Sequence, residues 1–310
     1  RLRTVTGVQT CALPIFCVYR FQALHDKRKA KGKRYALATI LMGIFLAKLC
    51  GEDKPSGIAE WARLREQWII KSLGLKRECM PHHNTYRRVL ASGIDVTEFE
   101  DLAREHFKHS GEAGYHVVAS MDGKIARGTI NTDAHDGLYL LAIYLPGEGV
   151  TLAQVAIESK QNEISAAPCL ISCINVRNKV VIGDALHTQR QISIQIGTAS
   201  GNYLWVVKGN HPQLLQDLYD WFDLSIPLLP GMGCPPKDFR SATVVSKGHE
   251  RLEVRTLTAS SQLNDFLEWP FLQQVFKLER FVTVQKTGHT RQETLYGITS
   301  LSTQQASPGR

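Results

Sequence analysis

The 310-residue sequence has no apolar run long enough to cross a bilayer, which takes roughly 18–20 residues. The best candidate, residues 36–49, contains Lys48 and stops before Gly51, so we interpret it as a buried helix and expect no membrane partner. Internal repeats are absent as well. The first fifteen residues lack the sustained apolar stretch of a signal peptide and match nothing downstream. Residues 1–15 are therefore interpreted as extraneous sequence outside the fold.

The sequence also lacks a disulfide framework, because its seven cysteines are odd in number and irregularly spaced. Cys169 and Cys173 stand four residues apart in a predicted helix, which would suit a metal site. No second cysteine or histidine pair follows at a spacing suited to zinc, so we interpret them as buried thiols. Reduced cysteines are typical of the cytoplasm, and we expect a cytoplasmic location.

Acidic residues are in deficit, since 37 Lys and Arg stand against 29 Asp and Glu, a net charge of +8. Such a balance suits a polyanionic partner such as DNA. The excess is concentrated early in the chain, where six of the eight residues from Lys27 to Arg34 are basic. The candidate DNA contacts in this region are Lys27, Arg28, Lys31, Lys33, Arg34, Arg87 and Arg88. A solvated basic surface is the alternative interpretation.

Apolar periodicity predicts helices over residues 35–49, 57–73, 84–90 and 96–109. The third of them is short, and its exposed face is expected to carry Tyr86 beside two arginines. Four helices of this kind predict a small helical domain over residues 20–110. It is either a helix-turn-helix-like DNA reader or a plain helical bundle with a basic surface.

The pattern changes after residue 110, where short apolar strands begin to alternate with helices. Strands are predicted over residues 115–121, 138–145, 150–157, 179–182 and 203–207, and helices over 162–174, 188–196 and 212–222. A Pro-rich loop over 227–236 precedes four more strands over 242–246, 252–258, 276–285 and 294–299. Residues 111–310 are therefore expected to form an α/β domain with a mixed sheet and helices on its faces.

Two aspartates are the candidate catalytic residues and metal ligands. Asp122 and Asp184 each follow a predicted apolar strand, where side chains emerge from a sheet into a crevice. Two carboxylates brought together suit Mg²⁺ or Mn²⁺, which would serve phosphodiester cleavage. The alternative is an Asp-Gly turn and a helix cap. Lys124, Arg127 and Lys208 would contact the DNA backbone, or they are ordinary surface charges.

Many ordered segments resemble one family, the H-repeat-associated transposases of bacterial insertion sequences, which belong to the DDE group. The segments are HDKRKAKGKRYALATIL, GIAEWA, HNTYRRVL, MDGKIARG, ESKQNEISAAP, GDALHTQ, YLWVVKGNHPQL, KGHERLEVR and LYGITSL. The resemblance implies an RNase H-like mixed sheet with a β-rich insertion, preceded by a helical DDE-transposase-associated domain. It implies that Asp122 and Asp184 are the first two members of an Asp-Asp-Glu triad that binds Mg²⁺. It also places Lys160, Asn162 and Glu163 near the site.

The resemblance is incomplete at the third carboxylate, which the family carries in a His-Trp-x-Ile-Glu-Asn segment after the stretch matching LYGITSL. The sequence ends at Arg310 before such a segment, so we expect a C-terminally truncated copy that is inactive in strand cleavage. The leading hypothesis is a transposase fragment that would act on insertion-sequence ends as a homo-oligomer. A non-catalytic DNA-binding protein and a metal-dependent nuclease of the same fold are the alternatives.

Overall fold

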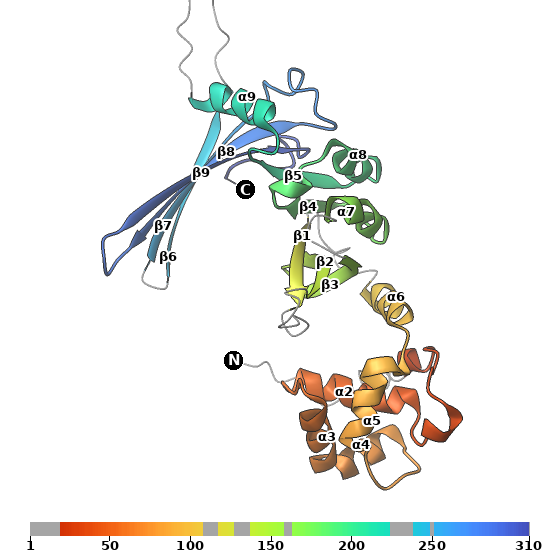
Figure 1. Ribbon diagram of the computed structural model, residues 1–310. Coiled ribbons are helices and arrows are strands. Elements are labelled where there is room, and N and C mark those ends of the chain that lie inside the picture. The colour runs from red at the N-terminus through yellow and green to blue at the C-terminus, as the bar shows by residue number, and fades with distance from the viewer. Residues whose placement is uncertain are drawn as a thin grey trace, which may run out of the picture. The chain divides into compact units, whose positions relative to one another are not determined.

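A computed structural model describes residues 19–107, 117–126, 137–157, 163–223, 238–248 and 251–309. The chain divides into two compact units, Arg1–Glu105 and His106–Arg310, whose elements are labelled in Figure 1. Within the described ranges, no helix combines the length and the apolar character needed to cross a membrane.

The first unit is helical. Its elements are a 3₁₀ turn, η1 (Ala30–Gly32), then α2 (Leu37–Leu49), α3 (Pro55–Leu64), α4 (Glu66–Leu73), α5 (His83–Arg88), a π-helical turn, η2 (Val89–Gly93), and α6 (Val96–Phe107). Pro55 begins α3 at a position that needs no backbone donor, and Gly74 ends α4 in the left-handed conformation. The predicted single helix over 57–73 is wrong, because the chain leaves the helical conformation at Arg65 and begins a second helix.

Helix α2 is the centre of this unit, because it is apolar on every side and buried along most of its length. Tyr86 of α5 packs onto Gly43 of α2, where a side chain would come within 3.2 Å of the tyrosine hydroxyl. Tyr86 is completely buried, which raises the pKa of its hydroxyl. The expectation that Tyr86 lies on an exposed face is therefore wrong, since the helix turns its aromatic side chain into the core.

The second unit is built on one nine-stranded sheet with the order β3-β2-β1-β4-β5-β9-β8-β7-β6. The strands are β1 (Val117–Ala126), β2 (Leu138–Leu145), β3 (Val150–Ile157), β4 (Lys179–Gly183), β5 (Asn202–Val207), β6 (Arg240–Gly248), β7 (Arg251–Ser260), β8 (Gln274–Val284) and β9 (Thr290–Thr299). Strands β1, β4 and β5 are parallel, and all other neighbours are antiparallel. The four C-terminal strands thus continue the same sheet, joined to it by the pairing of β5 with β9.

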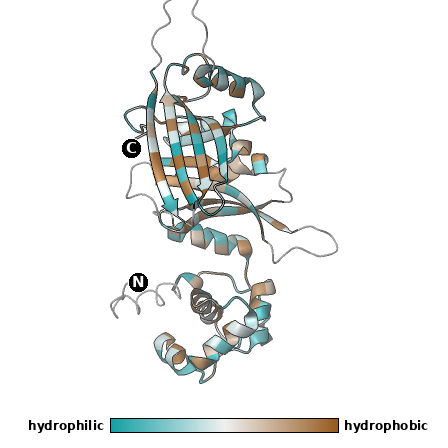
Figure 2. Cartoon of the chain, turned by 90° about the vertical axis from the view of Figure 1, so that its left-hand side faces the viewer, coloured by the Kyte–Doolittle hydropathy of each residue, from teal (hydrophilic) through white to brown (hydrophobic). Residues whose placement is uncertain are grey.

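Three helices accompany the sheet: α7 (Glu163–Ser172), α8 (Arg190–Thr198) and α9 (Pro212–Asp223). Helix α7 packs on β2 and β3, α8 packs on β5, and α9 packs on β9. Their apolar faces cover a core that includes Met121, Leu141, Ile143 and Trp205. Figure 2 shows that hydrophilic and hydrophobic residues alternate along the strands, the pattern expected of a sheet with a solvent face. An α/β unit with a mixed sheet is confirmed.

Several details differ from the sequence-based expectations. The predicted Pro-rich loop over residues 227–236 lies outside the described residues. Cys169 and Cys173 are exposed, so their interpretation as buried thiols is wrong. They face solvent because α7 turns Ala167, Leu170 and Ile171 toward the core instead.

Candidate active site

Asp122 lies inside a strand rather than after one. Strand β1 continues to Ala126, and Asp122 pairs with Ala142 of β2. The antiparallel partner supplies backbone hydrogen bonds through the Asp-Gly-Lys segment, which overrides its turn preference. Because side chains alternate along a strand, Asp122 shares the open face of the sheet with Ser120 and Lys124, whereas Met121 enters the core.

Asp184 follows β4 directly, as predicted. Its Oδ1 accepts a hydrogen bond of 3.1 Å from the Leu186 amide, which caps the short 3₁₀ turn η5 (Ala185–His187). The parallel register of β1 and β4 ends with Met121 beside Gly183. The next residues along the two neighbouring strands are Asp122 and Asp184, so the sheet brings these carboxylates to adjacent positions. Both side chains are open to solvent, with exposures of 60% for Asp122 and 57% for Asp184.

A buried acid and a buried histidine lie behind the two aspartates. The Glu163 Oε2 atom is 3.6 Å from Nε2 of His187, which is 3.7 Å from Oδ1 of Asp184. His187 is only 1% exposed and Glu163 is 3% exposed. Burial lowers the pKa of His187, while the carboxylates of Asp184 and Asp122 act in the opposite direction. Burial therefore favours the neutral imidazole of His187 beside the two acids.

Two glycines make room for this buried pair. A side chain at Gly123 would come within 2.3 Å of the Glu163 carboxylate, and one at Gly183 would come within 3.1 Å of the His187 ring. Each glycine is a direct neighbour of one of the two aspartates in the sequence. The resemblance placed Glu163 near the site, and the structure brings it there. The sequence gives no local signal for the burial of His187, because its contacts come from residues that the fold brings together.

Replacing Gly123 by alanine is expected to destabilise the second unit by about 1–3 kcal/mol, because the new methyl group overlaps the Glu163 carboxylate. Chemical denaturation measures the loss. Gly147→Ala is the matched control, since no heavy atom lies within 4 Å of its added carbon. Adding Glu163→Ala to Gly123→Ala should make the double variant less destabilised than the sum of the single changes. Equal stability of the Gly123 and Gly147 variants would contradict the packing described.

The two aspartates suit a divalent metal ion. Their hard oxygen ligands match the preference of Mg²⁺ and Mn²⁺, which commonly take one or two carboxylates and complete their shell with water and phosphate oxygens. Among the residues that the structure describes, no group of three or more acidic, histidine or cysteine side chains is arranged around one ion. An ion at this place would have Asp122 and Asp184 as its protein ligands, with Glu163 and His187 behind them.

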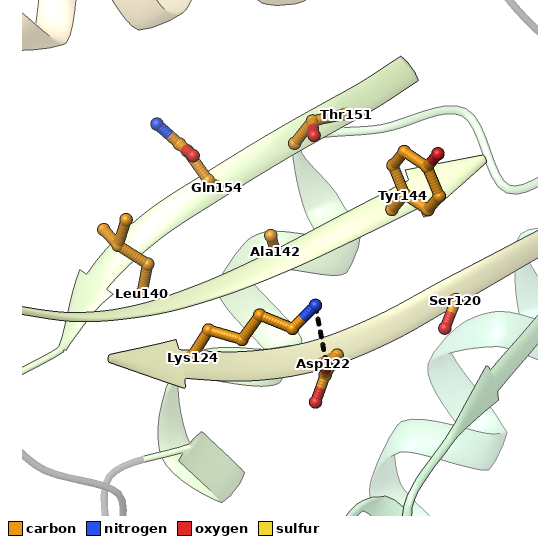
Figure 3. A pocket seen from close by; sticks show the side chains of 8 residues that line it. All are labelled: Ser120, Asp122, Lys124, Leu140, Ala142, Tyr144, Thr151 and Gln154. Carbon is orange, nitrogen blue, oxygen red and sulfur yellow. Dashed lines mark ion pairs between the residues drawn. The ribbon is translucent and has the colours of Figure 1, made fainter. Parts of the chain in front are cut away.

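Two of the lysines predicted to contact the DNA backbone, Lys124 and Lys208, lie in the described part of the chain, and both are exposed. The Lys124 ammonium lies 3.4 Å from Oδ2 of Asp122, but the lysine side chain is 80% exposed, so this pair contributes little stability. Lys208 is exposed immediately after β5. Arg127, Lys160 and Asn162 lie outside the described residues. A pocket of about 310 Å³ lies beside Asp122 and Lys124. Figure 3 shows the side chains from β1, β2 and β3 that line it.

The seven candidate DNA contacts of the helical unit fall into two groups. Three of them are engaged within the unit: Lys27 pairs with Asp95 at 2.6 Å, Arg28 pairs with Asp26 at 2.8 Å, and Lys33 donates to the Asp26 carbonyl at 3.1 Å. The Arg28 side chain is only 9% exposed, so this arginine braces the fold. The other four candidates, Lys31, Arg34, Arg87 and Arg88, are exposed.

Residues 18–107 match the DDE_Tnp_1-associated family model. The chain is 29% identical to the "Uncharacterized protein in dhlA 3'region" of Xanthobacter autotrophicus, over 84% of this chain and 86% of the relative. It is 26% identical to "Putative transposase YncI" of Escherichia coli O157:H7, over 79% of this chain but only 61% of that relative. For "H repeat-associated putative transposase YbfD" of Escherichia coli K12 the identity is 24%, over 79% of this chain and 94% of the relative.

A solved piggyBac transposase synaptic complex with hairpin DNA aligns with 96% of this chain and 62% of that one. Its TM-score of 0.39 and 9% identity are too low to establish a shared fold. The likeness to transposases therefore rests on the sequence relatives and not on this structure. The family match and these relatives confirm the resemblance to the transposases of bacterial insertion sequences that the ordered sequence motifs indicated.

Proposed function

We propose that this chain is part of a DDE transposase that cleaves and joins DNA strands at insertion-sequence ends. The observation that carries the proposal is the register of β1 and β4, which sets Asp122 and Asp184 side by side with exposed carboxylates. Relatives named as transposases over most of this chain point to the same activity. The three antiparallel strands followed by two parallel ones, with helices packed on the sheet, support an RNase H-like fold.

The chain's own residues would bind and orient the DNA phosphate. Asp122 and Asp184 would hold Mg²⁺ or Mn²⁺, which when bound activates a water or a 3′-hydroxyl and stabilises the leaving oxygen. Lys124 and Lys208 would neutralise the adjoining phosphates without recognising sequence. Glu163 and His187 would support the loop after β4 from behind and position the Asp184 carboxylate for metal binding.

The helical unit would add sequence-independent affinity for DNA through its exposed cations. Arg87 and Arg88 extend from the last turn of α5, whereas Lys27 and Arg28 are occupied by aspartates. The active form would be a homo-oligomer that pairs two DNA ends. We expect the polypeptide to bind both DNA and a divalent metal ion.

The test measures the affinity of the purified chain for DNA. The fluorescence anisotropy of a labelled duplex reports binding at each of several increasing salt concentrations. Each phosphate contact contributes roughly 0.9 to the slope of log affinity against log salt. Changing both Arg87 and Arg88 to alanine should lower the magnitude of the slope by up to about 2. The control is Lys48→Ala, a cation of the same unit that pairs with Asp53 at 3.0 Å.

Binding that is absent, or that does not respond to salt, would contradict the proposed function. Incubation of the same duplex with Mg²⁺ distinguishes the remaining alternatives. A nuclease of this fold would cut the duplex without joining ends, and a pure DNA-binding protein would keep its full function after Asp122→Asn.

A further inference from the structure

The open face of β1, β2 and β3 carries a groove that begins at Asp122 and crosses the three strands (Figure 3). Ala142 lies opposite Asp122 in the register and forms the low floor of the groove. Its neighbours on the same face of β2 are Leu140 and Tyr144, which form the two walls. The groove therefore leads from the candidate metal ligand across a small residue between two larger ones.

A β-bulge gives the groove its polar far side. Ile143 pairs with Ala153, but Tyr144 pairs with Thr151, so Leu152 is an extra residue in β3. Leu152 and Ala153 are both buried, although they are consecutive. In a regular strand, residues three apart point to opposite faces. The bulge reverses this, and both Thr151 and Gln154 come to line the open face.

The chemistry of the groove matches an unpaired nucleobase. Tyr144 is 41% exposed and offers an aromatic ring on which a base can stack. Gln154 is exposed across the floor from Asp122 and carries both a hydrogen-bond donor and an acceptor on one planar amide. A side-chain amide of this kind pairs most readily with adenine, through two hydrogen bonds to one base edge. The cationic end of Lys124 at the mouth of the groove favours a phosphate there.

We propose that this groove holds the base of the nucleotide adjoining the phosphate bound at Asp122, stacked on Tyr144 and recognised by Gln154. The inference rests on the proposed function, because it takes the position of the DNA from the two aspartates. DNA is favoured over a protein partner because Asp122 belongs to both the groove and the carboxylate pair, so a strand held at one continues into the other. Gln154 is then a specificity-determining residue, and Tyr144 supplies affinity for any base.

The experiment uses the full chain with Mg²⁺ and four labelled duplexes, each bearing a single-stranded extension of one base type. The wild-type chain should prefer the adenine extension by about tenfold. Gln154→Ala should remove this preference and leave the four extensions bound alike. Tyr144→Ala should weaken binding of all four by about tenfold, while Tyr144→Phe, which keeps the ring, should bind like the wild type.

Matched controls come from exposed residues of the same types elsewhere in the unit, Gln292 on β9 and Tyr219 on α9. Their alanine variants should leave both affinity and base preference unchanged. Circular dichroism establishes that each variant is folded. A chain that binds duplex DNA with the expected salt dependence, yet shows no effect of Gln154→Ala or Tyr144→Ala, overturns the groove and leaves the proposed function standing.

Two other outcomes also decide the matter. If the variants change the mass of the particle in light scattering while base preference stays as in the wild type, the groove contacts a second copy of the chain and the inference is wrong. If the wild-type chain binds none of the four DNAs, the proposed function fails and the inference fails with it.

Discussion

Replacing Asp184 by asparagine is expected to weaken Mn²⁺ binding by at least the roughly 10–100-fold that loss of an outer-shell partner costs a metal site. The change removes the charge of one of two adjacent carboxylates but keeps the Oδ1 atom that caps η5 through Leu186. A titration in which electron paramagnetic resonance detects the free Mn²⁺ measures this affinity directly. The measurement does not depend on any strand-cleavage activity. Asp122→Asn should have a similar effect, because each aspartate directly follows the last pair, Met121 and Gly183, of the register between β1 and β4.

Thermal unfolding separates loss of the site from loss of the fold. Without metal, the Asp184→Asn variant should be as stable as the wild type or slightly more so, because it removes repulsion between two neighbouring negative charges. Adding Mn²⁺ should raise the melting temperature of the wild type only, since a ligand stabilises the state that binds it. Asp101→Asn is the matched control, as this aspartate on α6 has the same 60% exposure as Asp122 and is also paired with a cation, Arg104. Equal Mn²⁺ affinity in the wild type and Asp184→Asn would show that the aspartates hold no ion.

The limits of sequence reasoning are clearest at β1, β2 and β3. The bounds of β2 and β3 are predicted to the residue, because apolar runs end at a Pro-Gly-Glu-Gly turn. The same reasoning ends β1 at Met121, because Asp-Gly is a common turn. Only the long-range pairing with β2 reveals that the strand continues to Ala126. The local sequence does not show which strand will pair with β1. The prediction therefore puts Asp122 after the end of the strand, although it lies within the strand.

The candidate site divides in the same way. The types of Asp122 and Asp184 and their proximity to apolar strands are visible in the sequence, but their adjacency depends on the parallel register of β1 with β4. Burial of Glu163 beneath Gly123 depends on the docking of α7 against the sheet. The groove depends on a bulge whose extra residue, Leu152, looks like any strand residue. In the helical unit, the run of basic residues is plain, yet nothing local shows that Lys27 is paired with Asp95 of a distant segment.

Replacing Ser193 by alanine is expected to cost the second unit about 2–6 kcal/mol, because one hydroxyl satisfies two buried indoles. The Ser193 Oγ atom accepts hydrogen bonds from Nε1 of Trp205 at 3.0 Å and of Trp269 at 3.1 Å. It donates its proton to the Gln189 carbonyl at 2.9 Å, so both lone pairs and the proton are used. The serine is fully buried, and the alanine variant would leave two indole N–H groups without a partner in the core.

Ser172→Ala is the control, since Ser172 makes the same kind of bond to a carbonyl of its own helix, Cys169, but is exposed. Urea unfolding followed by tryptophan fluorescence measures both variants, and a loss no larger than that of Ser172→Ala would contradict the role assigned to this hydroxyl. Mn²⁺ affinity of folded Ser193→Ala should stay near the wild-type value, because neither aspartate touches the serine. Asp184→Asn should do the opposite and lose affinity while keeping stability, so the two variants together distinguish the residues that build the framework from those that would bind the metal.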